Sequence, residues 1–220
     1  MKIAPRQIDG FLRAPRPEIR AILVYGADAG LVRERADALA RSIVDDLSDP
    51  FLVAEISPAS LREEPTLIAD EAAAISMTGG RRVVRVRDAS DAMVGPLERL
   101  LDDSPGDGLV IVQAGALTTR AGLRKLFESA DNAAAIACFA DDAQSLDRLI
   151  HDTLAQRNIT ASHDASAYLV ANLGADRGVS RSELEKLMLY VGEGATVSLD
   201  DAMASVGNSS AVSLDNLVMA

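Results

Sequence analysis

The sequence has few aromatic residues, a single cysteine and no long hydrophobic run. Tryptophan is absent, and only three tyrosines and four phenylalanines occur in 220 residues. The core must therefore come from Ala, Leu, Val and Ile, which suits Ala-rich helices packed on aliphatic strands. Cys138 can form no internal disulfide, which indicates a reducing compartment. No stretch approaches the ~20 apolar residues of a membrane span, and no secretory signal is visible, so we predict a cytoplasmic protein.

Positive charge is also scarce, with 22 Lys and Arg against 33 Asp and Glu and a net charge of -11. An acidic surface repels phosphate backbones, so we do not expect this chain alone to bind nucleic acid. One basic run, from Arg81 to Arg87, departs from this composition. In a strand, Arg81, Arg85 and Arg87 would share one face, where they could meet an acidic partner or lie near DNA. The alternative, which we favour slightly, is that these arginines pair with acids of the same chain.

Short aliphatic runs alternate with amphipathic helical stretches from Arg20 to Ala140. The pattern predicts strands at 21–26, 51–57, 82–86, 108–113 and 134–140. It predicts intervening helices at 31–47, 65–77, 96–101 and 120–129. Gly79 and Gly80 would end the second helix in a left-handed turn. Strands that alternate with helices predict an α/β fold with a parallel sheet covered on both faces, and the most aliphatic strand, 108–113, should be central.

After Asp142 the strand signal disappears. Helices are predicted at 145–157, 165–173, 181–191 and 199–205. Ser180 and Glu183 would form a capping box at the start of the third. We therefore predict an α/β domain over residues 1–142 and a small all-α domain over residues 143–220. The final segment, SLDNLVMA, resembles the first turns of a further helix.

The loop after the first strand is where a parallel α/β sheet is expected to bind a nucleotide. A working phosphate loop reads G-x-x-x-x-G-K-[ST]. Here Gly26 and Gly30 are one residue too close, neither Lys nor Ser/Thr follows, and Asp28 would repel a phosphate. The neighbouring strand that should supply an acid for magnesium offers Gln113 instead. We therefore predict a degenerate phosphate loop, without a bound nucleotide or any other cofactor.

Other catalytic arrangements have less support. His151 and His163 have no cysteine nearby and no histidine four residues away, so we predict no metal site. Cys138 lies in an aliphatic run, where apolar surroundings disfavour the reactive thiolate. Two alternatives to a binding protein remain. One is an active nucleotide-dependent enzyme of the P-loop type, and the other is a receiver-like signalling domain, which would need clustered acids that the predicted strand ends do not carry.

Four segments carry a family resemblance: MKIAPRQIDGFL, ILVYGADAGLVRERADAL, AISMTGGRRVVRVRDA and LGADRGVSRSELEKLMLYVG. In this order, and over essentially the whole chain, they resemble the delta subunit of bacterial DNA polymerase III. The complete DNA polymerase III holoenzyme is a DNA-directed DNA polymerase, and the delta subunit is a non-catalytic part of it. The resemblance implies an AAA+-type α/β domain, a helical lid and no ATPase activity. It further implies a clamp-loader subunit for DNA replication, which binds and opens the ring-shaped β sliding clamp. Other loader subunits would hydrolyse ATP, and the opened clamp would be placed on primed DNA.

The sequence departs from this family in two places. Family members carry a third, C-terminal helical domain that joins the other loader subunits, and we expect it to be missing here. The clamp-contacting tip of relatives carries two adjacent large apolar residues, and the matching positions are Met77 and Thr78. One bulky anchor therefore remains. Met77 would either contact the clamp or close the core face of its helix, and the sequence leaves both open.

Overall fold

A computed structural model describes residues 1–76, 79–103, 106–138, 143–174 and 176–206. Contacts divide the chain into two units, Met1–Ala27 with Val32–Cys138 and Asp28–Leu31 with Phe139–Ala220. The predicted boundary between residues 142 and 143 adjoins positions 139–142, which lie outside the described residues. The helix predicted for SLDNLVMA, residues 213–220, also lies outside them. Both therefore stay predictions.

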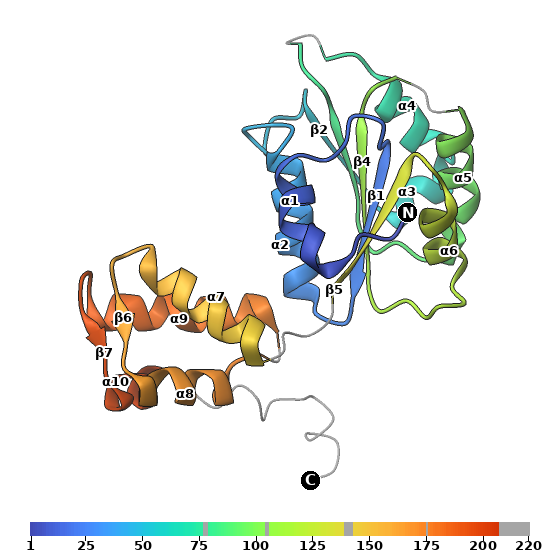
Figure 1. Cartoon of the computed structure of the whole chain (residues 1–220). Coiled ribbons are helices and arrows are strands. Elements are labelled where there is room, and N and C mark those ends of the chain that lie inside the picture. The colour runs from blue at the N-terminus through green and yellow to red at the C-terminus, as the bar shows by residue number, and fades with distance from the viewer. Residues whose placement is uncertain (77–78, 104–105, 139–142, 175, 207–220) are drawn as a thin grey trace. The chain divides into compact units, whose positions relative to one another are not determined.

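The first unit contains a parallel sheet of five strands in the order β2-β3-β4-β1-β5 (Figure 1). The strands are β1 (Ala21–Gly26), β2 (Val53–Ile56), β3 (Val83–Val86), β4 (Leu109–Ala114) and β5 (Ala133–Cys138). β1 lies between β4 and β5, so that Leu23 pairs with Val112 on one side and with Ala135 on the other. The predicted parallel sheet is confirmed, and β4 is its central strand.

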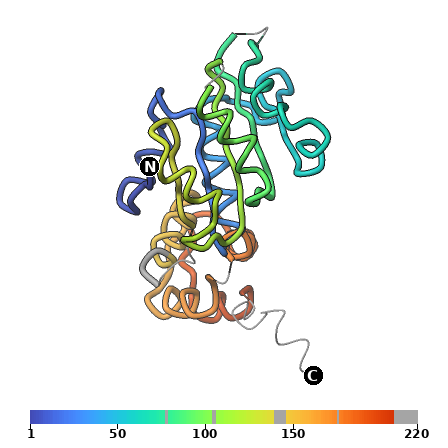
Figure 2. The backbone as a smooth tube through the Cα atoms, turned by 90° about the vertical axis from the view of Figure 1, so that its right-hand side faces the viewer, coloured from blue at the N-terminus to red at the C-terminus, as the bar shows by residue number. Residues whose placement is uncertain are grey.

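Helices cover both faces of this sheet (Figures 1 and 2). One face carries α1 (Ile8–Arg13) and α2 (Ala29–Arg41), and the other carries α3 (Pro58–Glu63), α4 (Leu67–Ala73), α5 (Val94–Asp103) and α6 (Gly122–Ser129). Single 3-10 turns, η1 (Pro5–Gln7) and η2 (Asp91–Met93), precede α1 and α5. The strands are therefore buried from both sides, as their continuous aliphatic runs require.

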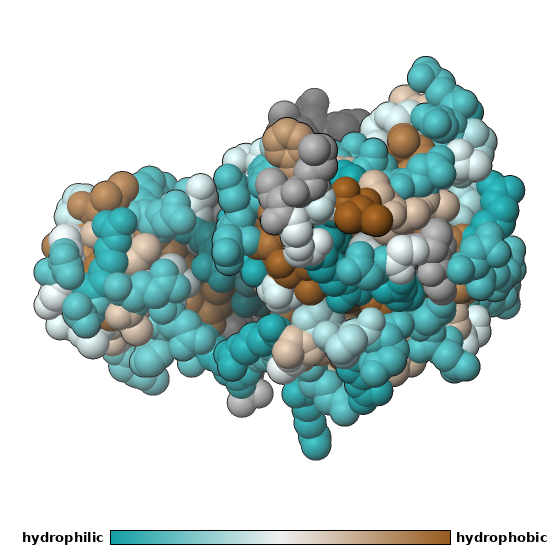
Figure 3. Space-filling view, turned by 90° about the horizontal axis from the view of Figure 1, so that it is seen from above, coloured by the Kyte–Doolittle hydropathy of each residue, from teal (hydrophilic) through white to brown (hydrophobic). Residues whose placement is uncertain are grey.

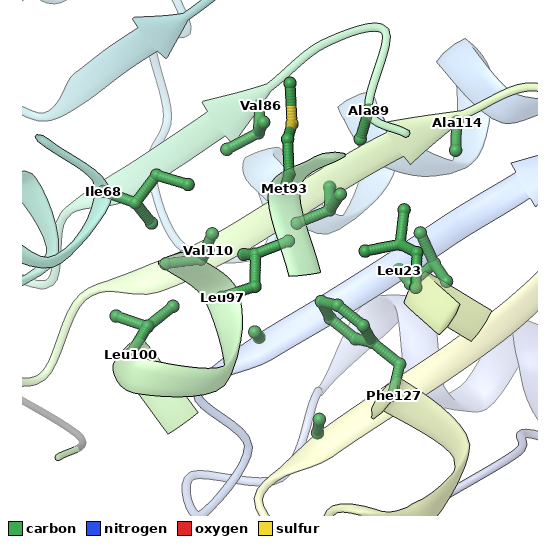
Figure 4. Close-up of a cluster of buried hydrophobic side chains, with 14 of the residues drawn as sticks. Leu23, Ile68, Val86, Ala89, Met93, Leu97, Leu100, Val110, Ala114 and Phe127 are labelled. Atoms are coloured by element: carbon green, nitrogen blue, oxygen red, sulfur yellow. The ribbon is translucent and has the colours of Figure 1, made fainter. Parts of the chain in front are cut away.

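A large apolar cluster fills the space between the sheet and helices α4 to α6 (Figure 4). Leu23 and Val110 contribute from the strands, and Leu97 and Phe127 contribute from α5 and α6. The strand residues of the opposite parity, such as Ile22, are equally buried on the other face. With a single phenylalanine among these residues, packing depends mainly on branched aliphatic side chains.

Two predicted helices are shorter than the sequence suggested. α2 ends at Arg41 and not near Leu47. The Ser42 and Val44 amides still donate to the Ala38 and Ala40 carbonyls at 3.1 and 3.0 Å, and the helical bonding goes no further. α4 ends at Ala73, and the backbone becomes extended at the next residue. The predicted continuation of α4 to residue 77 is therefore wrong.

Two further details of this region correct the expectation. Gly79 and Gly80 have φ values of 80° and 87°, left-handed as predicted, but they do not end α4. α3 was not predicted. Ser57 caps it by accepting from the Ser60 amide at 3.1 Å, and Pro58 occupies its first turn, where proline is tolerated.

The second unit is mainly helical. Its helices are α7 (Ala143–Ala155), α8 (His163–Asn172), α9 (Arg177–Val191) and α10 (Leu199–Ser205). They enclose a separate apolar cluster that includes Leu149, Leu169 and Leu184. A short parallel pair, β6 (Thr160–Ala161) with β7 (Thr196–Val197), was not predicted, because two-residue strands carry no periodic signal. In neither unit do the described residues form a helix both long and apolar enough to cross a bilayer.

The predicted capping box at Ser180 is wrong. α9 begins at Arg177, and Asp176 caps it by accepting from the Val179 amide at 3.0 Å. Ser180 lies inside the helix, where its hydroxyl accepts from the Gly174 amide at 3.0 Å. A carboxylate at the helix start also complements the helix dipole, which favours Asp176 over a hydroxyl as the cap.

The start of α6 is held by a residue distant in sequence. Asp91 accepts from the Gly122 and Leu123 amides at 3.0 and 2.9 Å. The residue at the cap position itself, Ala121, has no side-chain acceptor. These hydrogen bonds, that from Leu123 above all, favour the ionised carboxylate and lower the pKa of Asp91.

Replacing this carboxylate should weaken the fold in a pH-dependent way. We expect Asp91→Asn to lower Tm near neutral pH. Because the folded pKa lies below the unfolded value of ~3.9, the Asp91 contribution is present above that value and is lost as pH falls through the folded pKa. The Tm difference between wild type and variant should therefore shrink as the melting buffer is made more acidic.

The control is Asp102→Asn, since Asp102 is exposed and has no hydrogen bond or ion pair among the described residues. This control should leave Tm nearly unchanged at every pH. A Tm loss for Asp91→Asn that is equal in neutral and strongly acidic buffer would contradict the capping role.

Candidate functional site

The first glycine of the degenerate phosphate loop is required by strand packing. A Cβ atom built on Gly26 would lie 1.7 Å from the carbonyl oxygen of Cys138, the residue paired with it in β5. Any larger residue would push β1 and β5 apart. The glycine therefore has a structural reason that involves no phosphate.

The backbone amides of the loop are bound to carboxylates of the chain itself. Within the second unit, Asp28 is 3% exposed and accepts from the Leu31 amide at 2.8 Å and from the Arg177 amide at 3.3 Å. The Gly30 amide donates to Asp176 Oδ2 at 3.2 Å. Such amides are the groups with which a phosphate loop holds its ligand. Two of them are already satisfied here by negatively charged groups.

The same loop is closely packed. A Cβ atom on Gly30 would lie 2.3 Å from the Gly178 nitrogen, so this glycine too is required by a close backbone approach.

Gln113, at the end of β4, has a buried Nε2 without a hydrogen-bond partner among the described residues. The arrangement offers no carboxylate from β4 for magnesium and no lysine for phosphate. That the chain binds no nucleotide stays a prediction.

The arginines around β3 are engaged with groups of the first unit. Arg85 is buried and forms ion pairs with Asp37 and with Glu55, the latter at 3.4 Å. Arg87 donates twice to Glu55, at 2.6 and 2.9 Å, and this bonding raises the pKa of Arg87. Arg85 and Arg87 thus share one strand face and one acid, as the alternation along a strand predicts.

Arg81 and Arg82 also have local partners. Arg81 donates to the carbonyl oxygens of Asp107 and Ile19 at 2.6 and 2.9 Å. Arg82 pairs with Glu71 at 2.7 Å. Contact of Arg81, Arg85 and Arg87 with a partner or with DNA stays a prediction. Such a contact would require these arginines to bind the new partner as well as the groups of the first unit that they already contact.

The predicted clamp-contacting residues, Met77 and Thr78, lie outside the described residues, but their neighbours are described. Ile75, two residues after α4, has 92% of its surface exposed, whereas Ser76 is buried. Sequence reasoning missed Ile75. A helix continued to Met77 would have placed it on the buried face with Ile68 and Ala72, so only the early end of α4 reveals its exposure.

Ile75 lies near the edge of the sheet at which the parallel strands begin, because the chain enters β3 at Val83. Figure 3 views the molecule from this side, and the surface there is mainly hydrophilic with a few separate apolar patches. Ile75 is more exposed than any other large apolar side chain among the described residues, which makes it a candidate contact for another protein.

The two histidines lie in the second unit. His151 and His163 line a groove of about 1020 Å³ formed by α7, β6 and α8. No three His, Cys, Asp or Glu side chains come together for a metal ion in the part of the chain that the structure describes.

Comparisons with known proteins were made in sequence and in structure. No protein-family model matches the chain. A Rickettsia prowazekii protein named "Probable DNA polymerase III subunit delta" is 22% identical over 205 residues, which are 92% of this chain and 60% of that protein. The Bacillus subtilis DNA clamp loader delta protein superposes with a TM-score of 0.62 at 19% identity, over 93% of this chain and 62% of that one. The Thermotoga maritima RuvB Holliday junction branch migration motor superposes with a TM-score of 0.58 at 11% identity, over 92% and 68%.

These structural matches are too distant in sequence to show more than the fold. The chain has an AAA+-type fold. In sequence the chain is similar to the Rickettsia prowazekii protein, and in fold it is similar to the Bacillus subtilis clamp loader delta protein. The chain spans about 60% of the length of the curated relative it matches. The activity and partners of a whole delta subunit are therefore proposals for this chain.

The packing reason for the first loop glycine can be tested directly. Gly26→Ala should lower the free energy of unfolding by ~1–3 kcal/mol, the usual cost of overpacking, because its Cβ has no room beside Cys138. Urea denaturation of wild type and variant would measure this difference in the free energy of unfolding. The matched control is Gly115→Ala, where no atom lies within 4 Å of the new Cβ. Equal losses at the two positions would show that close packing is not the reason for Gly26.

The occupied loop amides also predict the response to nucleotide. ATP with magnesium should leave Tm unchanged, because Asp28 and Asp176 hold the amides of Leu31 and Gly30. A ligand at ~100 times its Kd would add ~2.7 kcal/mol of stability, which a thermal melt detects easily. A reproducible increase in Tm with ATP and magnesium, but not with magnesium alone, would support the alternative that the chain is an active P-loop enzyme.

Proposed function

We propose that this chain is a clamp-loader subunit of the DNA polymerase III delta type, which binds and opens the β sliding clamp and has no ATPase activity of its own. Its similarity to the Rickettsia prowazekii protein and the fold it shares with the Bacillus subtilis clamp loader delta protein support this role. The carboxylates bound to the loop amides support the absence of ATPase activity.

The observation that carries the proposal is the exposure of Ile75. Burial of such a side chain in a pocket of a partner gains ~1.5–3 kcal/mol. Ile75 and Met77 are two apolar residues separated by Ser76, close to positions 77 and 78, at which the resemblance implies an adjacent pair. Gly79 and Gly80 then turn the chain through the left-handed region before it enters β3. In this proposal Ile75 and Met77 are the apolar anchors of a clamp-binding tip, defined as residues 75–80.

The remaining partners follow from the same role. Other clamp-loader subunits would supply the ATP hydrolysis that this chain lacks. Primed DNA would be met through the complex, because a net charge of -11 disfavours binding by the isolated chain.

Truncation of the exposed anchor tests the proposal. Ile75→Ala should weaken binding to the cognate β clamp by ~1–3 kcal/mol, about 5- to 150-fold in Kd, the range for an interface anchor. Tm should change little, because the side chain is already exposed in the free protein. Titration calorimetry with purified clamp measures the first quantity, and a thermal melt measures the second.

Leu189→Ala is the matched control, since Leu189 is a large apolar side chain on α9 of the second unit that is 72% exposed. It should leave clamp affinity unchanged. Undiminished affinity of Ile75→Ala would move the contact away from Ile75. The absence of any clamp binding by the wild-type chain would refute the proposed function itself.

Ring opening needs its own measurement. A clamp closed around nicked circular DNA can leave only if the ring opens. We expect the wild-type chain to speed the release of labelled clamp from such DNA, and Ile75→Ala to reduce this effect in proportion to its lost affinity. Binding without faster release would leave a clamp-binding protein that does not open the ring.

A further inference from the structure

A cleft of about 470 Å³ lies in the first unit, away from residues 75–80. It is formed by α3, the segment before α4, η2 and the start of α5. Its volume falls within the range of sites that hold a small molecule or a few residues of a peptide.

The walls of this cleft are unusually rigid for a surface feature. Pro58, Pro65 and Pro96 line it, and each proline ring fixes its own backbone φ angle. Leu61 and Met93 provide an apolar floor and belong to the buried cluster beneath (Figure 4 shows Met93 beside Val86 and Ala89). A ligand would therefore meet a largely preformed site, with little loss of conformational entropy in the protein.

The charge of the cleft opposes that of the chain. Among the residues that the structure describes, Arg62 and Arg99 line it and no Asp or Glu does. Neither arginine has an ion pair or hydrogen bond among the described residues, unlike the arginines around β3. Two unpaired guanidinium groups beside an apolar floor, in a chain of net charge -11, favour a ligand that is both acidic and apolar.

The cleft and the clamp-binding tip lie at opposite edges of the sheet. Pro58 follows the end of β2, and Ser90 follows the end of β3, so the cleft is at the edge where the parallel strands end. Open α/β sheets bind their ligands outside this edge. Ile75 precedes β3 and lies at the other edge. The cleft is therefore independent of the clamp contact.

We propose that this cleft binds a short acidic peptide segment that carries one apolar side chain. The apolar side chain packs on Leu61 and Met93, and flanking carboxylates pair with Arg62 and Arg99. A single-stranded nucleic acid is the less suitable ligand, because none of the described residues that line the cleft is an aromatic on which a base could stack.

The test uses the whole chain with methyl-labelled methionine and a synthetic peptide, acetyl-Glu-Asp-Leu-Asp-Glu-amide. NMR titration should give a saturable shift of the Met93 methyl resonance, assigned with a Met93→Leu variant. The double variant Arg62→Glu/Arg99→Glu should bind this peptide at least about tenfold more weakly, because it replaces two attractive charges by two that repel the flanking carboxylates. The charge-matched control is Arg33→Glu/Arg41→Glu, because both arginines are exposed on α2 and have no bonded partner among the described residues.

Each result decides between ligand classes. A serine in place of the leucine in the peptide should abolish the saturable shift, and the control variant should bind as wild type does. No Met93 shift at millimolar peptide, or equal binding of the serine peptide, would overturn the proposal. An oligonucleotide that shifts Met93 at lower concentration than the peptide would also overturn it and assign the cleft to phosphate. Clamp affinity of Arg62→Glu/Arg99→Glu should stay unchanged, so this test can fail without the proposed function failing.

Discussion

β1 is hydrogen-bonded on both sides and buried on both faces, and the first unit is organised around this constraint. β4 and β5 pair with it residue by residue, and every residue of the strand is inaccessible to solvent. A strand in this position tolerates only apolar side chains, and it must end at a glycine where β5 approaches most closely. The same pairing directs the ends of all five parallel strands to one edge of the sheet. Ile75 lies near the edge at which the strands begin, and the loop after β1 and the cleft lie near the edge at which the strands end. At both edges, loops and helix ends replace the backbone pairing of the strands.

Most of the fold could be predicted because a buried parallel strand has a continuous aliphatic run in the sequence. All five strands were located, and the most aliphatic one is central. Helix ends were less accurate, since the spacing of Ile43 and Leu47 continues the helical period beyond the residue at which α2 ends. α3 was missed because a helix of six residues that starts with a proline has the composition of a loop.

The candidate site could be predicted only in part. A degenerate phosphate loop was predicted from the spacing of Gly26 and Gly30 and from the missing lysine, and it stays a prediction. Its bond to Asp176 was not foreseeable, because the two partners are 146 positions apart in the sequence. The exposure of Ile75 depends on where α4 ends, and helical periodicity continues past that point. Both gaps have one cause, which is that local pattern carries no information on contacts that only the folded chain creates.

The carboxylates at the loop have an evolutionary consequence. Removal of Asp28 alone would leave Asp176 on the Gly30 amide, and removal of Asp176 alone would take the cap from α9, at a typical cost of ~1 kcal/mol. Neither change helps a nucleotide until a lysine and a hydroxyl also appear after Gly30. Each single step back therefore lowers stability or does nothing, and no intermediate has an advantage. If the chain binds no nucleotide, as we predict, selection for folding alone would keep this arrangement, and a return to nucleotide chemistry would need several changes at once.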